Sequence, residues 1–317
     1  MDRRSFITAL SASALFGCAS TTPKKSKPPV VASKGKARFH VFSKMFQSPV
    51  TKSPEELCDL FAGAGYQGVQ WTVRPGGHAT AENVKTELPR LVKIAEERGL
   101  KVESICTAIV ARDSSAETIV KTAGDCGIRL FRPGYYFYNQ KKGESLSSSL
   151  DRIRRGFDDL YALARSSGMR FAYQNHSTWG SPTKHGEVFG APIWDLHSVL
   201  KDLDPQYAGV EFDPMHALFE NFHSWSQAME LVAPYIAAVD LKDFRYKMDE
   251  KHPGWMYKEM VAAGEGVVPW GDVAALQRRF GVDVPYVVHF EYDFDKTDLR
   301  RTVSRELAGF AAALGAS

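Results

Sequence analysis

Residues 169–213 read MRFAYQNHSTWGSPTKHGEVFGAPIWDLHSVLKDLDPQYAGVEFD. This stretch contains two short apolar runs, at 169–176 and 207–213, with a segment of helical period at 193–203 between them. A strand, a helix and a second strand in this order form a βαβ unit, in which the two strands lie parallel in one sheet. The stretch therefore predicts a parallel sheet covered by helices.

The same alternation continues in both directions along the chain. It predicts eight strands, near 38–46, 66–73, 100–109, 127–133, 169–176, 207–213, 236–243 and 285–292. It predicts helices over 53–64, 81–98, 114–125, 146–167, 193–203, 224–233, 270–280 and 298–313. Eight βα units indicate an α/β fold of a single domain, a (β/α)8 or TIM barrel over residues 38–317.

An open, doubly wound sheet is the alternative architecture. Such a sheet usually has a glycine-rich phosphate-binding turn after its first strand. Here the first strand is followed by Ser43-Lys44-Met45-Phe46-Gln47, which contains no glycine. The turn therefore favours the barrel.

The N-terminus has the features of a targeting segment. Arg3-Arg4 precede an apolar run from Phe6 to Gly17 that is too short to span a bilayer, which resembles a twin-arginine signal. The residues before Cys18 resemble a lipobox, in which the cysteine is lipidated; a chance cysteine in an uncleaved signal is the alternative. We expect a signal at 1–18, a flexible tether at 19–37, and an exported lipoprotein that faces the periplasm and touches the membrane only through its lipid anchor.

The net charge of +3 is unevenly distributed. Residues 1–38 contain eight basic residues and one acidic residue, so the remaining 279 residues carry −4. A mildly acidic body argues against a nucleic-acid partner. Beyond Cys18, the odd number of cysteines, Cys58, Cys106 and Cys126, predicts small buried side chains rather than disulfides or a zinc cluster.

Polar residues gather where three predicted strands end, and barrel enzymes build their active sites at these ends. Because strand side chains alternate, Gln174 shares a side with His176, and His289 shares a side with Glu291. Asp213 closes its strand, and His216 follows it within reach of the same space. A divalent ion such as Mn2+, Mg2+ or Co2+ needs several oxygen and imidazole ligands that converge from different strands. Arg132 closes the predicted strand 127–133, and Trp179 lies in the loop after the predicted strand 169–176. With His216 and His289, they are candidates to bind a carbohydrate substrate.

The chain resembles the xylose isomerase-like sugar isomerase/epimerase family, the barrels grouped with AP endonuclease family 2. The resemblance covers residues 38–315. It rests on Gln174-Asn175-His176, Phe212-Asp213-Pro214-Met215-His216, Leu241-Lys242-Asp243-Phe244, Gly264-Glu265-Gly266-Val267-Val268-Pro269-Trp270 and His289-Phe290-Glu291-Tyr292. Gly190 to Leu196 resembles a branch of the family that has secretion leaders.

The resemblance implies a divalent metal held by a Glu, an Asp, a His and a Glu that end successive strands. Asp213 and Glu291 match this pattern, whereas Gln174 stands for the first Glu and Asp240 for the His. The implied metal ligands are therefore Gln174, Asp213, Asp240 and Glu291. Because an amide does not titrate, Gln174 cannot act as a general base, and an exchange between two glutamates is not available.

With these residues, the resemblance implies proton abstraction next to the carbonyl of a sugar or keto-sugar. Glu291 or His176 would take the proton, and Lys242 would neutralise the oxyanion or only balance buried charge. We expect a metal-dependent sugar isomerase or epimerase. The alternatives are a 3-keto-glycoside lyase or hydrolase of the same fold, and a carbohydrate-binding lipoprotein without catalytic activity.

Overall fold

The computed structural model describes residues 36–47, 50, 52–178 and 187–316. The predicted signal with Cys18, nearly all of the predicted tether and Trp179 lie outside the described residues. Among the described residues, no helix combines the length and the apolar character needed to cross a membrane.

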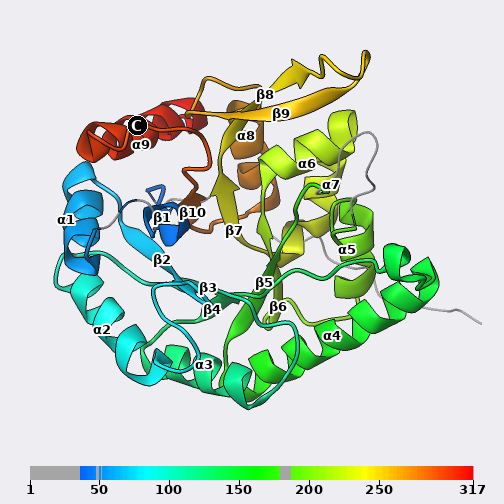
Figure 1. The fold of residues 1–317 in the computed structure, drawn as a ribbon, viewed down its shortest axis with the longest axis horizontal. Coiled ribbons are helices and arrows are strands. Elements are labelled where there is room, and N and C mark those ends of the chain that lie inside the picture. Colours follow the sequence, from blue (N-terminus) through cyan, green and yellow to red (C-terminus); the bar gives the residue numbers. More distant parts are fainter. Residues whose placement is uncertain (1–35, 48–49, 51, 179–186, 317) are drawn as a thin grey trace, which may run out of the picture. The chain divides into compact units, whose positions relative to one another are not determined.

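Eight parallel strands close into a barrel, as the sequence predicts (Figure 1). Their order around the barrel is β1-β10-β7-β6-β5-β4-β3-β2. The bounds are β1 (Phe39–Phe42), β2 (Gly68–Val73), β3 (Ser104–Thr107), β4 (Leu130–Arg132), β5 (Arg170–Gln174), β6 (Ala208–Phe212), β7 (Ile236–Leu241) and β10 (Tyr286–Val288). The predicted (β/α)8 fold is confirmed.

A ring of helices surrounds the strands (Figure 1). The helices at the predicted places are α1 (Pro54–Ala64), α2 (Val84–Glu96), α3 (Ser114–Asp125), α4 (Leu146–Ser167), α5 (Ile193–Leu200), α7 (Trp225–Val232), α8 (Trp270–Phe280) and α9 (Leu299–Leu314). Helix α1 shows how sequence sets these bounds. Ser53 and Glu56 form a capping box with Pro54 in the first turn, and Gly65 ends the helix in the left-handed conformation.

The side chains inside the barrel change from apolar to polar along its axis. A small apolar cluster fills part of it, with Cys106, Leu130, Ala172, Ala238 and Val287 among its members. Two residues further along each of these five strands stand Ala108, Arg132, Gln174, Asp240 and His289. Since alternate residues share a side of a strand, the charged and polar side chains form a layer toward the carboxyl ends of the strands.

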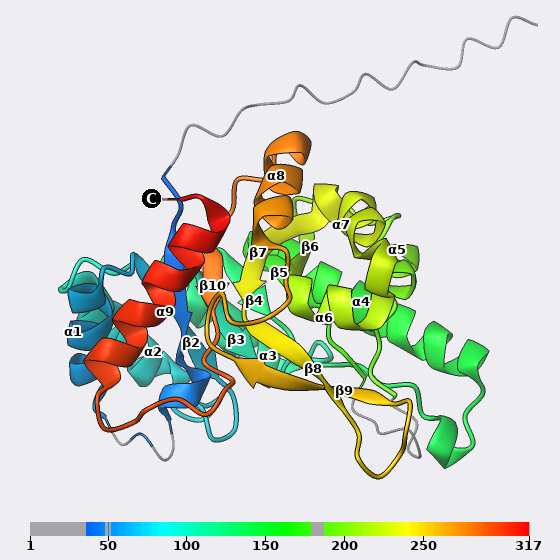
Figure 2. The ribbon, with the colours of Figure 1, turned by 90° about the horizontal axis from the view of Figure 1, so that it is seen from above.

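Two elements on the carboxyl-end side were not predicted. Helix α6 (Pro214–Asn221) follows β6 directly, because Asp213 accepts a hydrogen bond from the backbone of His216 and Pro214 is fixed in a helical φ. A hairpin of β8 (Asp243–Met248) and β9 (Met256–Val261) leaves the barrel after β7 (Figure 2). Short 3-10 turns η1 (Ser43–Phe46), η2 (Gln140–Lys142), η3 (Phe222–Ser224) and η4 (Ala233–Tyr235) complete the assigned elements of the described residues.

Asp243 connects the motif at 241–244, to which it belongs, with the motif at 264–270. Its buried carboxylate accepts hydrogen bonds from the backbone of Gly264 and Gly266 at 3.2 Å each and of Val268 at 3.3 Å, and from Trp270 Nε1 at 3.3 Å. A Cβ atom at Gly266 would lie 1.9 Å from Asp243 Oδ1, so only glycine fits there. The Asp243 carboxylate therefore fixes the 264–270 segment that leads into α8.

Candidate functional site

The floor of the barrel mouth has a lysine between two carboxylates. Lys242 Nζ lies 3.1 Å from Asp213 Oδ2 and 3.3 Å from Glu291 Oε2. Lys242 and Asp213 are buried, whereas the Glu291 side chain is 23% exposed. Solvent can therefore reach this network at Glu291.

Glu291 and Lys242 are charged at neutral pH. Burial favours the neutral form of Glu291, but the Lys242 ammonium and a hydrogen bond from His289 hold its pKa well below the ordinary range. Burial also disfavours the Lys242 ammonium, yet Asp213, Glu291 and Asp240 raise its pKa. The mouth therefore presents a carboxylate beside an ammonium group.

Gln174, at the end of β5, is a hydrogen-bond donor to two carboxylates. Its Nε2 atom donates to Asp213 Oδ2 at 3.1 Å and to Asp240 Oδ2 at 2.5 Å, and its Oε1 atom accepts from the Tyr135 hydroxyl. A glutamate at this position would add a negative charge beside two others. The amide instead joins Asp213 to Asp240.

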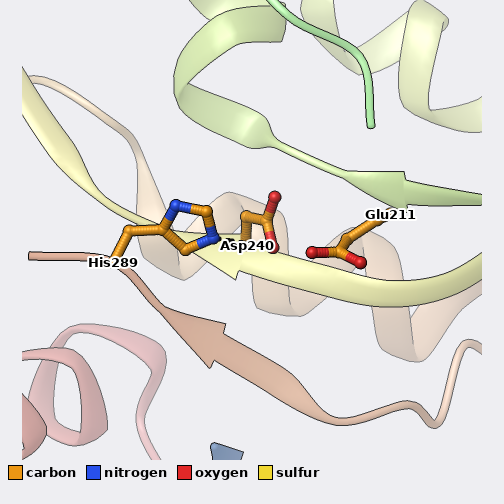
Figure 3. A group of neighbouring side chains, drawn as sticks. All are labelled: Glu211, Asp240 and His289. Carbon is orange, nitrogen blue, oxygen red and sulfur yellow. Dashed lines mark ion pairs between the residues drawn. The ribbon is translucent and has the colours of Figure 1, made fainter. Parts of the chain in front are cut away.

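A second group lies deeper in the barrel. Glu211 of β6, Asp240 of β7 and His289 just after β10 point toward one another (Figure 3). Each offers one ligand atom, and these atoms lie within 4.8 Å of one another. Among the described residues, this is the one set of three or more His, Cys, Asp and Glu side chains that is so arranged, and it could hold a metal ion.

Glu211 belongs to this inner group and was not predicted. Arg132 Nη1 lies 3.2 Å from Glu211 Oε1, and Gln70 Nε2 donates to both carboxylate oxygens at 3.1–3.2 Å. Burial and the neighbouring Asp240 raise the pKa of Glu211 to about 8, despite Arg132. Burial and Asp213 raise the pKa of Asp240 to about 7.

His289 connects the inner group to the mouth. Its Nδ1 atom lies 3.3 Å from Glu291 Oε1, and its Nε2 atom lies 3.2 Å from Asp240 Oδ1. The second approach lacks the alignment of a hydrogen bond, since neither Nε2 nor Oδ1 has a hydrogen-bond partner among the described residues. Burial lowers the pKa of His289 to about 4, so the imidazole is neutral.

Two histidines line the β5 and β6 side of the mouth. The His176 and His216 ring centroids lie 3.9 Å apart with the ring planes tilted by 37°, and His216 Nδ1 lies 2.5 Å from Ser177 Oγ. Burial lowers the pKa of His176 to about 3 and that of His216 well below its ordinary value. His176 Nδ1 lies 2.7 Å from the Ser177 carbonyl, to which it donates, so its Nε2 atom has the lone pair.

Most of the predicted site residues meet in this region. Gln174, His176, Asp213, His216, Asp240, Lys242, His289 and Glu291 are linked through the contacts above. Arg132 was expected to contact substrate but is buried, with its guanidinium against Glu211 and over the Phe42 ring. Trp179 lies outside the described residues.

Four residues that contact this network were not predicted as site residues: Gln70, Tyr135, Ser177 and Glu211. Glu211 stands two residues before Asp213, on the same side of β6, and this alternation was the available signal. Gln70 and Tyr135 had no comparable signal, because single polar or aromatic residues near strand ends are common in barrels.

The four predicted metal ligands form a hydrogen-bonded network in this structure. The Lys242 ammonium lies between Asp213 and Glu291, and the Gln174 amide nitrogen lies between Asp213 and Asp240. Donor groups thus stand where a cation would be expected among these four. The inner group differs, because two of its ligand atoms have no hydrogen-bond partner among the described residues.

Comparison with known proteins identifies a family and a fold. A family model described as xylose isomerase-like TIM barrel matches residues 58–310. No curated protein matches the chain.

Three solved structures illustrate the fold similarity. A 3-keto-D-glucoside 4-epimerase from E. coli is 12% identical, with a TM-score of 0.65 over 87% of this chain and 100% of that one. A D-psicose 3-epimerase from Clostridium cellulolyticum H10 with D-tagatose is 11% identical, with a TM-score of 0.63 over 87% and 99%. A xylose isomerase-like TIM barrel protein from Mycobacterium smegmatis in complex with magnesium is 12% identical, with a TM-score of 0.61 over 88% and 97%.

Proposed function

Because the chain belongs to the xylose isomerase-like TIM barrel family, we propose that it is a sugar isomerase or epimerase that transfers a proton next to the carbonyl of a sugar or keto-sugar. Two solved structures of similar fold are epimerases, one of a 3-keto-D-glucoside and one of D-psicose. At 11–12% identity they share the fold with this chain, so the proposal depends on the chemistry of the mouth.

The observation that carries the proposal is the pairing of Glu291 with Lys242. Removing a proton next to a carbonyl leaves an enolate, whose oxygen becomes negative. Glu291 is an unprotonated, partly exposed carboxylate, and a cation lies 3.3 Å from it. Glu291 would take the proton, and Lys242 would stabilise the enolate oxygen.

His176 is the second candidate to move a proton. It follows β5, whereas Glu291 follows β10, and β6 and β7 lie between these strands in the barrel. A substrate held over Lys242 would therefore meet Glu291 on one side and the His176 imidazole on the other. An epimerase needs such a pair, because the proton must return to the opposite face of the carbon.

Gln174 and Asp213 are positioning residues in this proposal. Gln174 cannot take up a proton, but its amide holds Asp213 and Asp240 in place. Asp213 holds the Lys242 ammonium at 3.1 Å. Both act on substrate through Lys242.

A divalent metal ion is also part of the proposal. Glu211, Asp240 and His289 would hold it, since two unpartnered ligand atoms face each other there. When bound, it would supply positive charge beneath the floor of the mouth. The proton steps above use the chain's own residues and do not pass through the metal.

The test is hydrogen exchange in D2O. Wild type would be incubated with ketohexoses, aldoses and 3-keto glycosides, and deuterium incorporation at carbon would be measured by NMR. Glu291→Gln should abolish incorporation, whereas the isosteric Glu306→Gln, at a buried carboxyl outside the mouth, should retain it. If wild type binds a sugar saturably but incorporates no deuterium into any of these sugars, a carbohydrate-binding protein would be favoured instead.

The same experiment distinguishes elimination from isomerisation. A 3-keto-glycoside lyase would release the group attached to the anomeric carbon and leave an unsaturated sugar. An epimerase would retain the mass of the substrate apart from deuterium. Chromatography with mass detection therefore assigns the reaction.

We also propose that the protein is exported and anchored by a lipid at Cys18. The support is the arginine pair Arg3-Arg4, the short apolar run and the cysteine that ends it.

A further inference from the structure

We propose that Glu211, Asp240 and His289 form a divalent transition-metal site inside the barrel, a set that shares only Asp240 with the four ligands predicted from sequence. The three side chains come from β6, β7 and the residue after β10, which are neighbours in the barrel (Figure 3). This inference rests on the proposed function, which includes a divalent metal at these residues, and its tests measure the bound metal rather than sugar turnover.

The geometry around His289 points to a cation. Its Nδ1 atom faces Glu291 Oε1 at 3.3 Å, where Nδ1–H can donate to the carboxylate. Its Nε2 lone pair then faces Asp240 Oδ1 at 3.2 Å, and neither atom has a hydrogen-bond partner among the described residues. Two lone pairs at this distance repel each other unless a positive charge lies beside them.

The 3.2 Å separation also suits coordination. Two ligands at about 2.1 Å from one ion, roughly at right angles, lie about 3 Å apart. A metal-bound histidine commonly donates its other ring N–H to a carboxylate, and Glu291 stands in that position. Glu211 would supply the third ligand.

Charge balance supports the same conclusion. The carboxyl groups of Glu211, Asp213, Asp240 and Glu291 form one connected network. The buried cations that contact this network are Arg132 and Lys242, among the described residues. Lys44, which is 44% exposed, reaches Glu291 only at 3.9 Å. With all four carboxyl groups ionised, a divalent ion would compensate the negative charge that these two buried cations leave, which is costly to bury.

The donor set indicates which metal would bind. Two carboxylates and one imidazole suit Mn2+, Fe2+, Co2+ or Zn2+ better than Ca2+, which prefers oxygen ligands alone. The three residues are almost fully buried. We therefore expect the ion to exchange slowly and to be retained through purification without chelators.

The first experiment measures metal content by mass spectrometry. Wild-type protein, purified without chelators or refolded with excess Mn2+, should contain about one equivalent of metal. Asp240→Asn and His289→Gln should lose it, and Glu306→Gln, which changes another buried carboxyl, should keep it. Circular dichroism would verify that each variant is folded.

The second experiment needs only wild type and one variant that folds. Pulsed electron paramagnetic resonance of the Mn2+-loaded protein should detect a directly bound imidazole nitrogen, because His289 is a ligand. The four residues predicted from sequence offer only oxygen ligands or an amide. His289→Gln should remove the nitrogen signal, whereas His216→Gln should leave it.

Three outcomes would overturn the proposal. In the first, wild type refolded with Mn2+ contains no metal and shows no rise in melting temperature. In the second, Mn2+ binds without a nitrogen signal, which would assign it to oxygen ligands such as Asp213 and Glu291. In the third, the signal persists in His289→Gln.

Discussion

Lys242 Nζ and Glu291 Oε2 lie 3.3 Å apart at the floor of the barrel mouth. The pair joins a proton acceptor to the group that can neutralise the charge created when the proton leaves. Each has a further partner, Asp213 for the lysine and His289 for the glutamate. Both groups are therefore held in place before a substrate binds.

Replacing Glu291 with glutamine tests the base. Glu291→Gln removes the titrating group and keeps its shape, so kcat should fall by about 10²–10⁴ while sugar binding persists. Rates would come from the deuterium assay and affinities from calorimetry. Near-normal turnover in Glu291→Gln together with inactive His176→Ala would make His176 the base.

Replacing Lys242 with methionine tests the cation. Lys242→Met keeps most of the side-chain volume but leaves Asp213 buried without its cation, which should cost about 3–5 kcal/mol of stability. The pKa of Glu291 should rise, because Lys242 is the main group that lowers it. The acid limb of the pH–rate profile should then move to higher pH. An unchanged acid limb would contradict the assigned role of the pair.

Acid should destabilise the protein through buried histidines. His40 is fully buried, its ring nitrogens have no hydrogen-bond partner among the described residues, and burial lowers its pKa to about 4. A lowered folded-state pKa means that stability is present above pH 6.5 and is lost as the pH falls toward 4, by about 3 kcal/mol for one such group.

Urea unfolding at several pH values would measure this loss. His40→Leu should flatten the dependence between pH 6.5 and 4, because the unfolded variant gains one proton fewer. An equally steep dependence in the variant would mean that other groups cause the acid sensitivity.

Gly266 and Gly271 provide a matched pair for the 264–270 segment. Gly266→Ala would place a Cβ atom 1.9 Å from Asp243 Oδ1 and should destabilise the protein by about 1–3 kcal/mol or more. Gly271, in α8, has open space around it, so Gly271→Ala should be neutral or stabilising by roughly 0.5–1 kcal/mol. Thermal unfolding of both variants checks the contrast, and equal melting temperatures would contradict it.

The lipid anchor is tested by fractionation. Cys18→Ala should move the protein from the membrane fraction to the soluble fraction of the native host, because the thiol that would be lipidated is lost. Wild type that is already fully soluble would argue against an anchor.

The barrel could be predicted from sequence because each strand and helix has its own hydrophobic period. Helix α6 was missed because Asp213-Pro214 both ends a strand and begins a helix. The hairpin was missed because the predicted strand 236–243 ran past Leu241 into the first residue of β8. In both cases one short stretch serves two elements.

Only part of the site could be predicted from the sequence, and the reason is related. Residues at the ends of strands are recognisable, since polar side chains there interrupt apolar runs. Glu211 lies inside such a run, between Val210 and Phe212, where a buried side chain is expected to be apolar. Its partners Arg132 and Gln70 come from β4 and β2, and these pairings depend on how the barrel closes.

Lys242 and Asp243 are consecutive residues, and consecutive side chains of an extended chain point to opposite sides. One therefore enters the barrel while the other anchors the 264–270 segment. Inserting or deleting a single residue before them would exchange the two, bringing a carboxylate among the acids and an ammonium group against the glycines. The number of residues between β7 and this pair therefore matters as much as the identity of either residue. An insertion or deletion there should disrupt the site, whereas one at the tip of the β8–β9 hairpin should be tolerated.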